Sequence, residues 1–169
     1  MLAIVGSVTP PGRLRRAVAD ALERSGLRTD LLDLAEVALP FADGSDPDPA
    51  TGEVIARVAA APAVLLATPV YRGSLTGVLK NLLDLVPAEA LEGKPVAILA
   101  MGATPRHFLG AERHLRDVLA FFGAHVVPVA GYLTSGDFAD GVPSPDAAEE
   151  VDRVVAQLSG LRAALSPIV

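Results

Sequence analysis

Short apolar runs alternate with longer amphipathic segments along this chain, and the alternation restricts its fold more than any other feature. The apolar runs have the length and composition of strands that are covered on both faces of a sheet. They lie at residues 2–5, 28–34, 63–67, 95–100 and 124–130. The other segments place apolar residues on one helical face. They predict helices over residues 12–25, 50–60, 75–86, 107–122 and 146–165.

Strands that alternate with helices favour a parallel sheet with right-handed crossovers. We therefore predict an α/β fold of three layers, with a five-stranded parallel sheet of order 2-1-3-4-5 and helices on both faces. The chain has 169 residues and neither an internal repeat nor a linker, so we expect a single domain over residues 1–169. The proline-rich segment 35–50 is expected to be irregular, and residues 131–145 are expected to form a loop.

Composition narrows the functions that this chain can have. Apolar residues make up 51% of it, which predicts that it folds throughout. It contains no cysteine, so neither disulfides nor a thiolate site are expected. The net charge of −6 and the scattered arginines argue against a broad nucleic-acid surface. The apolar runs are too short to span a membrane and the first residues do not resemble a signal peptide, so we expect a cytoplasmic protein.

In an open sheet of this order, ligands bind at the carboxyl ends of the strands, where three turns are expected to meet. They are residues 6–13, 68–74 and 101–107. The first turn, from Gly6 to Arg13, joins a strand to a helix, where free N–H groups and the helix dipole favour an anion. Ser7, Thr9 and Arg13 add hydroxyls and a positive charge. A phosphate site and a solvated loop with capping hydroxyls both remain open, because neither a dinucleotide fingerprint nor a P-loop is present.

The central turn places a flat ring and a planar cation, Tyr71 and Arg72, between Pro69 and Gly73. Proline fixes one backbone angle, and glycine permits unusual angles or a close approach to a ligand. Ser74 is suitably placed to cap the following helix. This combination indicates a turn that holds a ligand.

The third turn offers a floor of small residues, Gly102 and Ala103, against which a flat ligand could lie. Thr104 is a candidate helix cap. His107 and His114 share a helical face, but no further ligand completes a metal set, so a surface or capping role is expected for them. A phosphorylated planar cofactor such as FMN would suit all three turns. The lack of an evident acid, base or nucleophile agrees with chemistry that a cofactor supplies.

The stretch Thr68-Pro69-Val70-Tyr71-Arg72-Gly73-Ser74, together with the segments 91–96, 102–104 and His107, resembles the NAD(P)H-dependent FMN reductases of the flavodoxin-like fold. Within that family the chain is most similar to the branch that supplies reduced FMN to alkanesulfonate monooxygenases. The resemblance implies hydride transfer from NADPH or NADH to FMN, with a monooxygenase as a possible partner. A flavoprotein quinone or azo reductase and a non-enzymatic electron carrier remain alternatives, and so does a domain that has lost its flavin.

The resemblance also implies which residues bind FMN. Those in the first turn would hold the phosphate, those in the central turn would wrap the ribityl chain and one ring edge, and those in the third would contact the polar edge. The expected cofactor-binding residues are Ser7, Thr9, Arg13, Pro69, Val70, Tyr71, Arg72, Gly73, Ser74, Gly102, Ala103, Thr104 and His107. No catalytic side chain and no metal ligand is expected.

Three positions depart from the family pattern. Gly12 stands where the family usually has a serine, and Ala103 stands where it usually has a second glycine. Arg113, with His114 beside it, occupies a position that is often aromatic or histidine in this branch. The family tends to form homodimers or homotetramers, and the predicted helices 75–86 and 107–122 are the candidate surface, with Phe121 off the buried stripe.

Overall fold

A parallel sheet of order β2-β1-β3-β4-β5 forms the centre of the molecule in the computed structural model, as the sequence predicted. The structure describes residues 1–9, 12–107 and 110–166, without the side chain of His107. The strands of this sheet are β1 (Leu2–Val5), β2 (Asp30–Asp33), β3 (Val64–Pro69), β4 (Pro95–Gly102), β5 (His125–Val126) and β6 (Gly131–Thr134). All their pairings are parallel.

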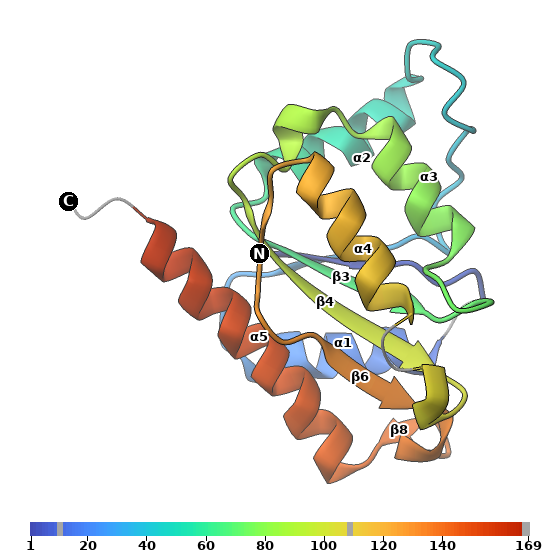
Figure 1. The fold of residues 1–169 in the computed structure, drawn as a ribbon, viewed down its shortest axis with the longest axis vertical. Helices are drawn as coiled ribbons and strands as arrows, with labels where there is room; N and C mark the ends of the chain where they lie inside the picture. Colours follow the sequence, from blue (N-terminus) through green and yellow to red (C-terminus); the bar gives the residue numbers. More distant parts are fainter. Residues whose placement is uncertain (10–11, 108–109, 167–169) are drawn as a thin grey trace.

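Five α-helices cover the two faces of the sheet (Figure 1). They are α1 (Arg13–Arg24), α2 (Pro49–Ala60), α3 (Gly77–Leu85), α4 (Gly110–Phe121) and α5 (Pro145–Leu165). Helices α1 and α5 lie on one face, and α2, α3 and α4 lie on the other. Because side chains alternate along a strand, Ala3 and Val5 pack towards α1 and α5, whereas Leu2 and Ile4 pack towards the other three helices. The result is the three-layer arrangement expected from the sequence.

The predicted strand over residues 124–130 is wrong in its extent, because two short strands replace it. β5 pairs with the beginning of β4 and β6 pairs with its end. Pro128, which lacks a backbone N–H, lies in the gap between them. There, Arg116 Nη2 donates hydrogen bonds to the carbonyl oxygens of Val127 and Pro128 at 3.0 and 2.9 Å. The arginine thus satisfies the strand's carbonyls where its pairing is interrupted.

The stretch 131–145 is consequently not the loop that was predicted. After β6 it contains the short 3₁₀ helix η3 (Ser135–Asp137) and a hairpin of β7 (Phe138–Ala139) and β8 (Val142–Pro143). Gly131 permits β6 to pack closely, since a Cβ atom there would lie 2.6 Å from Val154 Cγ2. Sequence position alone did not reveal that β4 is long enough to pair with two strands in succession.

Two helix starts also differ from their predictions. The helix after the central turn begins at Gly77 and is capped by Thr76, so the predicted cap at Ser74 is wrong. The helix after the third turn begins at Gly110, and the 3₁₀ helix η2 (Pro105–His107) precedes it. Phe108, which falls within the predicted helix 107–122, lies outside the described residues. The short 3₁₀ helix η1 (Ala88–Ala90) and the irregular segment before α2 complete the chain, and no helix in the described ranges has the length and apolar content needed to cross a membrane.

Candidate functional site

A cavity of about 460 Å³ opens at the carboxyl end of the sheet, where the three predicted turns meet. Its lining residues are Ser7, Thr9, Gly12, Arg13, Leu14, Pro69, Val70, Tyr71, Met101, Gly102, Ala103 and Ser135. Most of the predicted cofactor-binding residues are therefore brought together in one place. Among the described lining residues the only charged side chain is that of Arg13, and there is no carboxylate. The cavity thus suits a ligand that carries negative charge.

A second cavity, of about 490 Å³, lies between α1 and α5. Its charged residues are Arg24 and Asp152, which bind each other through Arg24 Nη2 and Asp152 Oδ1 at 2.8 Å. The remaining lining is made of small and apolar residues and two serines. This cavity offers no comparable set of polar groups for a cofactor.

The first turn has the features of a phosphate site. Ser7 is only 6% exposed, and its hydroxyl has no hydrogen-bond partner among the described residues. Helix α1 begins directly beside it, with Gly12 at the N-cap and no side-chain cap on its first N–H groups. A buried unpaired hydroxyl and uncapped helical N–H groups are groups that a phosphate would satisfy. The residues present therefore fit the phosphate of FMN.

Arg13 is held in place by a segment that sequence reasoning missed. Its Nη1 donates to the carbonyl oxygen of Ser135 at 3.2 Å, and its Nη2 donates to Ser135 Oγ at 3.4 Å. The guanidinium carbon lies 5.7 Å from the centre of the Phe138 ring. Ser135 and Phe138 follow β6, which was predicted to be part of a loop. No local sequence signal connects them with Arg13, because only the pairing of β6 with β4 brings them to this edge.

The central turn is a two-residue hairpin. The backbone N–H of Tyr71 donates to Ser74 O at 2.9 Å, and the N–H of Ser74 donates to Tyr71 O at 3.0 Å. Arg72 and Gly73 between them have φ angles of 52° and 79°, as a type I′ turn requires. Tyr71 lines the cavity and is 49% exposed. The turn therefore presents the tyrosine at the cavity rim.

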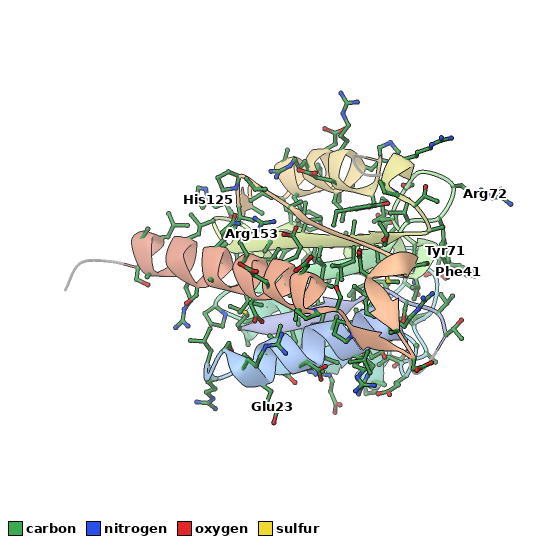
Figure 2. The ribbon with its side chains drawn as sticks, turned by 90° about the horizontal axis from the view of Figure 1, so that it is seen from below. Glu23, Phe41, Tyr71, Arg72, His125 and Arg153 are labelled. Carbon is green, nitrogen blue, oxygen red and sulfur yellow. The ribbon has the colours of Figure 1, made fainter. Side chains whose placement is uncertain are left out.

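The other predicted residues of this turn do not line the cavity. Arg72 points away from the molecule, at the same end where Tyr71 and Phe41 lie (Figure 2). Ser74 Oγ lies 2.8 Å from His114 Nδ1, so its hydroxyl is directed to helix α4. Gly110, the first residue of that helix, packs directly against the carbonyl oxygen of Gly73. Helix α4 thus supports the turn from behind.

Thr76 joins the central turn to the first. Its backbone N–H donates to Thr68 Oγ1 at 3.2 Å, and its hydroxyl donates to Gly6 O at 2.6 Å. The same hydroxyl accepts from the N–H of Leu79 at 3.4 Å, which caps α3. Gly6 is required for this close approach, because a Cβ atom there would lie 2.7 Å from Leu79 Cβ. The spacing between the two ligand-facing turns is therefore fixed by buried contacts.

The third turn begins where β4 ends. Gly102 is buried at the end of that strand, and Ala103 follows it in an exposed position, with both residues lining the cavity. Thr104 does not line it. The Thr104 hydroxyl accepts from the N–H of Arg106 at 3.4 Å, and its carbonyl oxygen accepts from the Tyr132 hydroxyl at 2.7 Å. Burial raises the pKa of that tyrosine above its ordinary value of about 10, at which the hydroxyl is already a neutral donor at physiological pH.

Metal chemistry finds no support at this edge or elsewhere in the described ranges, where no group of three or more histidine and carboxylate side chains could hold an ion. The one buried carboxylate near the edge, Asp33 at the end of β2, is paired with Arg15 Nε at 3.1 Å. His107, predicted to contact the cofactor, belongs to η2, and its side chain lies outside the described residues.

Comparison with known proteins identifies the family. Residues 1–139 match the model of the family described as NADPH-dependent FMN reductase. The chain belongs to this family. It is 37% identical over 132 residues to an NAD(P)H-dependent FAD/FMN reductase of Geobacillus thermodenitrificans, covering 76% of this chain and 70% of the relative. It is 35% identical over 147 residues to the NADH-dependent FMN reductase SfnF of Pseudomonas fluorescens, covering 83% and 79%.

A solved structure supports the same assignment. The apo form of the NADH:FMN oxidoreductase EmoB has a TM-score of 0.79 and 28% identity, covering 99% of this chain and 90% of that one. The predictions of an FMN reductase and of FMN and NAD(P)H as its cofactors are thereby confirmed. The alternative of a non-enzymatic electron carrier is not supported by these relatives. A flavodoxin from the domain Archaea, with a TM-score of 0.67 and 13% identity over 96% of this chain and 99% of that one, confirms the flavodoxin-like fold.

Proposed function

We propose that the cavity at the carboxyl end of the sheet is the FMN site of this reductase. The observation that supports it most strongly is the meeting of the three turns around the unpaired, buried hydroxyl of Ser7. In this arrangement Ser7, Thr9, Arg13 and the start of α1 bind the phosphate. Pro69, Val70 and Tyr71 lie along the ribityl chain and one ring edge, and Gly102 and Ala103 face the polar edge.

The other predicted residues act at a distance from the cavity. Arg72, Gly73 and Ser74 shape the central turn, and Thr104 orders the third. When bound here, FMN would supply the redox chemistry, which is hydride transfer from the reduced pyridine nucleotide. The chain itself supplies binding and orientation, and its small residues at Gly102 and Ala103 permit a flat ring to approach the backbone. We propose that one domain, residues 1–169, carries all of this, because α5 packs into the same core as β1 and β3.

The test begins with the purified protein, whose visible spectrum reports bound flavin. Oxidation of NADPH and of NADH is then followed by the loss of absorbance of the reduced nucleotide, with and without added FMN. Oxidation that depends on FMN supports the proposal. A protein that binds FMN without oxidising either nucleotide would sink it, and so would turnover that survives Arg13→Ala together with Ser7→Ala at unchanged FMN affinity.

We also propose that reduced FMN leaves this site for a flavin-dependent monooxygenase. The rim of the cavity supports this, because Thr9, Tyr71 and Ala103 are exposed and leave the site open to solvent. Whether the protein retains FMN decides whether FMN is a bound cofactor or an exchanged substrate. If FMN is exchanged, gel filtration of the loaded protein should strip the flavin, and the rate should saturate in free FMN. Flavin that co-elutes and is reduced in place would contradict release.

We propose a homodimer or homotetramer that forms through α3 and α4. Phe121 is 80% exposed and meets Phe122 edge to face, with ring centres 5.7 Å apart. A groove of about 300 Å³ beside it is lined by Leu83, Val86 and Val118 and by the ion pair of Lys80 and Asp84. An exposed aromatic next to a largely apolar groove is typical of an interface.

Light scattering on the wild-type protein and on Phe121→Glu tests this surface. We expect the wild type to be oligomeric and the variant to shift to monomer with an unchanged circular dichroism spectrum. Glu23→Lys, a change of charge at an exposed position of α1 on the opposite face of the sheet, serves as the control. A wild-type monomer, or a variant that assembles as the wild type does, would refute this interface.

A further inference from the structure

We infer that Ser135 and Phe138 are positioning residues that hold Arg13 for the phosphate of FMN. They form an aromatic and hydroxyl platform outside the first turn, and no other described residue hydrogen-bonds the Arg13 side chain. The inference rests on the proposed FMN site and adds to it a segment outside the three predicted turns. It assigns to the segment after β6 a part in selecting phosphorylated flavin over flavin without a phosphate.

The first step is that the residues next to Arg13 in the first turn offer no group that could orient its guanidinium. Gly12 has no side chain, although the space is present. A Cβ atom there would lie 3.5 Å from Thr9 O and 3.7 Å from Ser7 Oγ, which are ordinary contacts. Leu14, the next lining residue, is apolar and buried. No hydroxyl at these positions can fix the guanidinium of Arg13.

The second step is that the chain supplies that support from 122 residues away. Both terminal nitrogens of Arg13 donate to Ser135, one to its carbonyl oxygen and one to its hydroxyl. The ring of Phe138 lies beneath the guanidinium. A cation held over an aromatic face and by two hydrogen bonds keeps one orientation. Ser135 itself lines the cavity, so the guanidinium that it holds lies at the cavity wall.

The third step is that the platform is rigid. Asp137 Oδ2 accepts from the N–H of Thr134 at 2.6 Å and from its hydroxyl at 2.9 Å, which closes a capping box around Ser135. The N–H of Ser144 donates to Asp137 O at 2.8 Å and ties the far side of the hairpin to the same residue. Phe138 packs against the core beneath α1 and α5. Arg13 thus rests on ordered structure.

The test compares binding of FMN and riboflavin, which differ by the phosphate alone, using quenching of flavin fluorescence. In the double variant Ser135→Ala with Phe138→Leu we expect FMN affinity to fall roughly three- to tenfold, because an aromatic contact and a hydrogen bond are lost. Riboflavin affinity should not change. Phe138→Tyr retains the ring and should bind FMN as the wild type does. Circular dichroism verifies that each variant is folded.

A cycle with Arg13→Ala then asks whether the platform acts through the arginine. If it does, the double variant should have no further effect on FMN affinity once Arg13 is absent. Equal losses for both flavins, losses that add to that of Arg13→Ala, or an unchanged affinity for FMN would each overturn the inference. Wild-type protein that binds neither flavin would overturn the FMN site as well. Wild-type protein that binds FMN and riboflavin equally would overturn the platform and the phosphate contacts of the first turn, but not the binding of the flavin ring in this cavity.

Discussion

Thr76 Oγ1 donates a 2.6 Å hydrogen bond to the carbonyl oxygen of Gly6, 70 residues earlier in the chain. Both groups are buried, and the bond joins two turns that face the ligand. It also places the first residues of α3 directly behind the first turn. The relative position of the two turns is therefore set inside the core, where solvent and bound flavin have little influence on it.

We predict that Thr76→Val destabilises the protein by about 1–3 kcal/mol, because Gly6 O and the N–H of Leu79 lose their buried partner. Thr76→Ser keeps the hydroxyl and should lose less than half as much. Urea denaturation measures both changes. If the two variants proved equally stable, the hydrogen bond would make no contribution to the stability of the protein.

Gly110→Ala is expected to disturb the central turn, since a Cβ atom at this position overlaps the carbonyl oxygen of Gly73. The backbone there cannot move without shifting Tyr71, so both stability and FMN affinity should fall, with a loss of stability of about 1–3 kcal/mol. Gly160→Ala in α5, where a Cβ atom meets nothing within 4 Å, is the matched control. It should be neutral or stabilising by up to about 1 kcal/mol. A loss at Gly160 as large as that at Gly110, or no loss at Gly110, would contradict the role of the contact with the turn.

The ion pair of Arg15 and Asp33 predicts that two neighbouring arginines contribute very differently to the stability of the protein. The Asp33 side chain is fully buried and lies 3.1 Å from Arg15 Nε, whereas Arg16 and Asp20 are exposed and 3.8 Å apart. Arg15→Ala leaves a buried carboxylate without its cation and should cost about 2–4 kcal/mol. Arg16→Ala should cost less than about 0.5 kcal/mol. Urea denaturation of both variants at one pH makes the comparison, and equal stabilities would contradict it.

Asp48 predicts a pH dependence of stability. It caps α2, and hydrogen bonds from the N–H and hydroxyl of Thr51 lower the pKa of its carboxyl group. The stabilisation from this lowered pKa is therefore complete above the unfolded pKa of about 3.9 and is lost as pH falls through the folded pKa. Asp48→Asn can still accept the backbone N–H but does not titrate. The stability difference between wild type and variant should shrink as the pH is lowered into this range, and a difference independent of pH would contradict the assignment.

The sequence predicted the fold where a pattern was local. Runs such as 63–67 could be assigned as strands because their residues are uniformly apolar, and the alternation of elements then implied the parallel order. The prediction failed at β6, whose four residues end in a polar one. They form a strand only because β4 is long enough to pair with them. It failed also at Ser74, because the hairpin of residues 71–74 displaced the helix start by two residues to the cap at Thr76.

The candidate site, too, could be predicted from the sequence only in part. The three turns could be located because strand ends and their glycines and prolines mark them in the sequence. The support beneath Arg13 could not, since Ser135 and Phe138 are ordinary residues in a stretch without a motif. Their position depends on the register between Gly102 and Thr134. Contacts between segments far apart in the chain leave no trace in the local sequence of either segment.

Arg72 adopts a φ of 52° in the hairpin of the central turn. A side chain in this left-handed conformation costs about 1 kcal/mol that glycine would not. Random mutagenesis followed by selection for thermal stability should therefore replace Arg72 with glycine or asparagine. Selection for turnover should keep the arginine wherever its charge is used. Comparing the frequency of arginine at position 72 after the two selections would then weigh the contribution of its charge to turnover against the cost of the left-handed backbone.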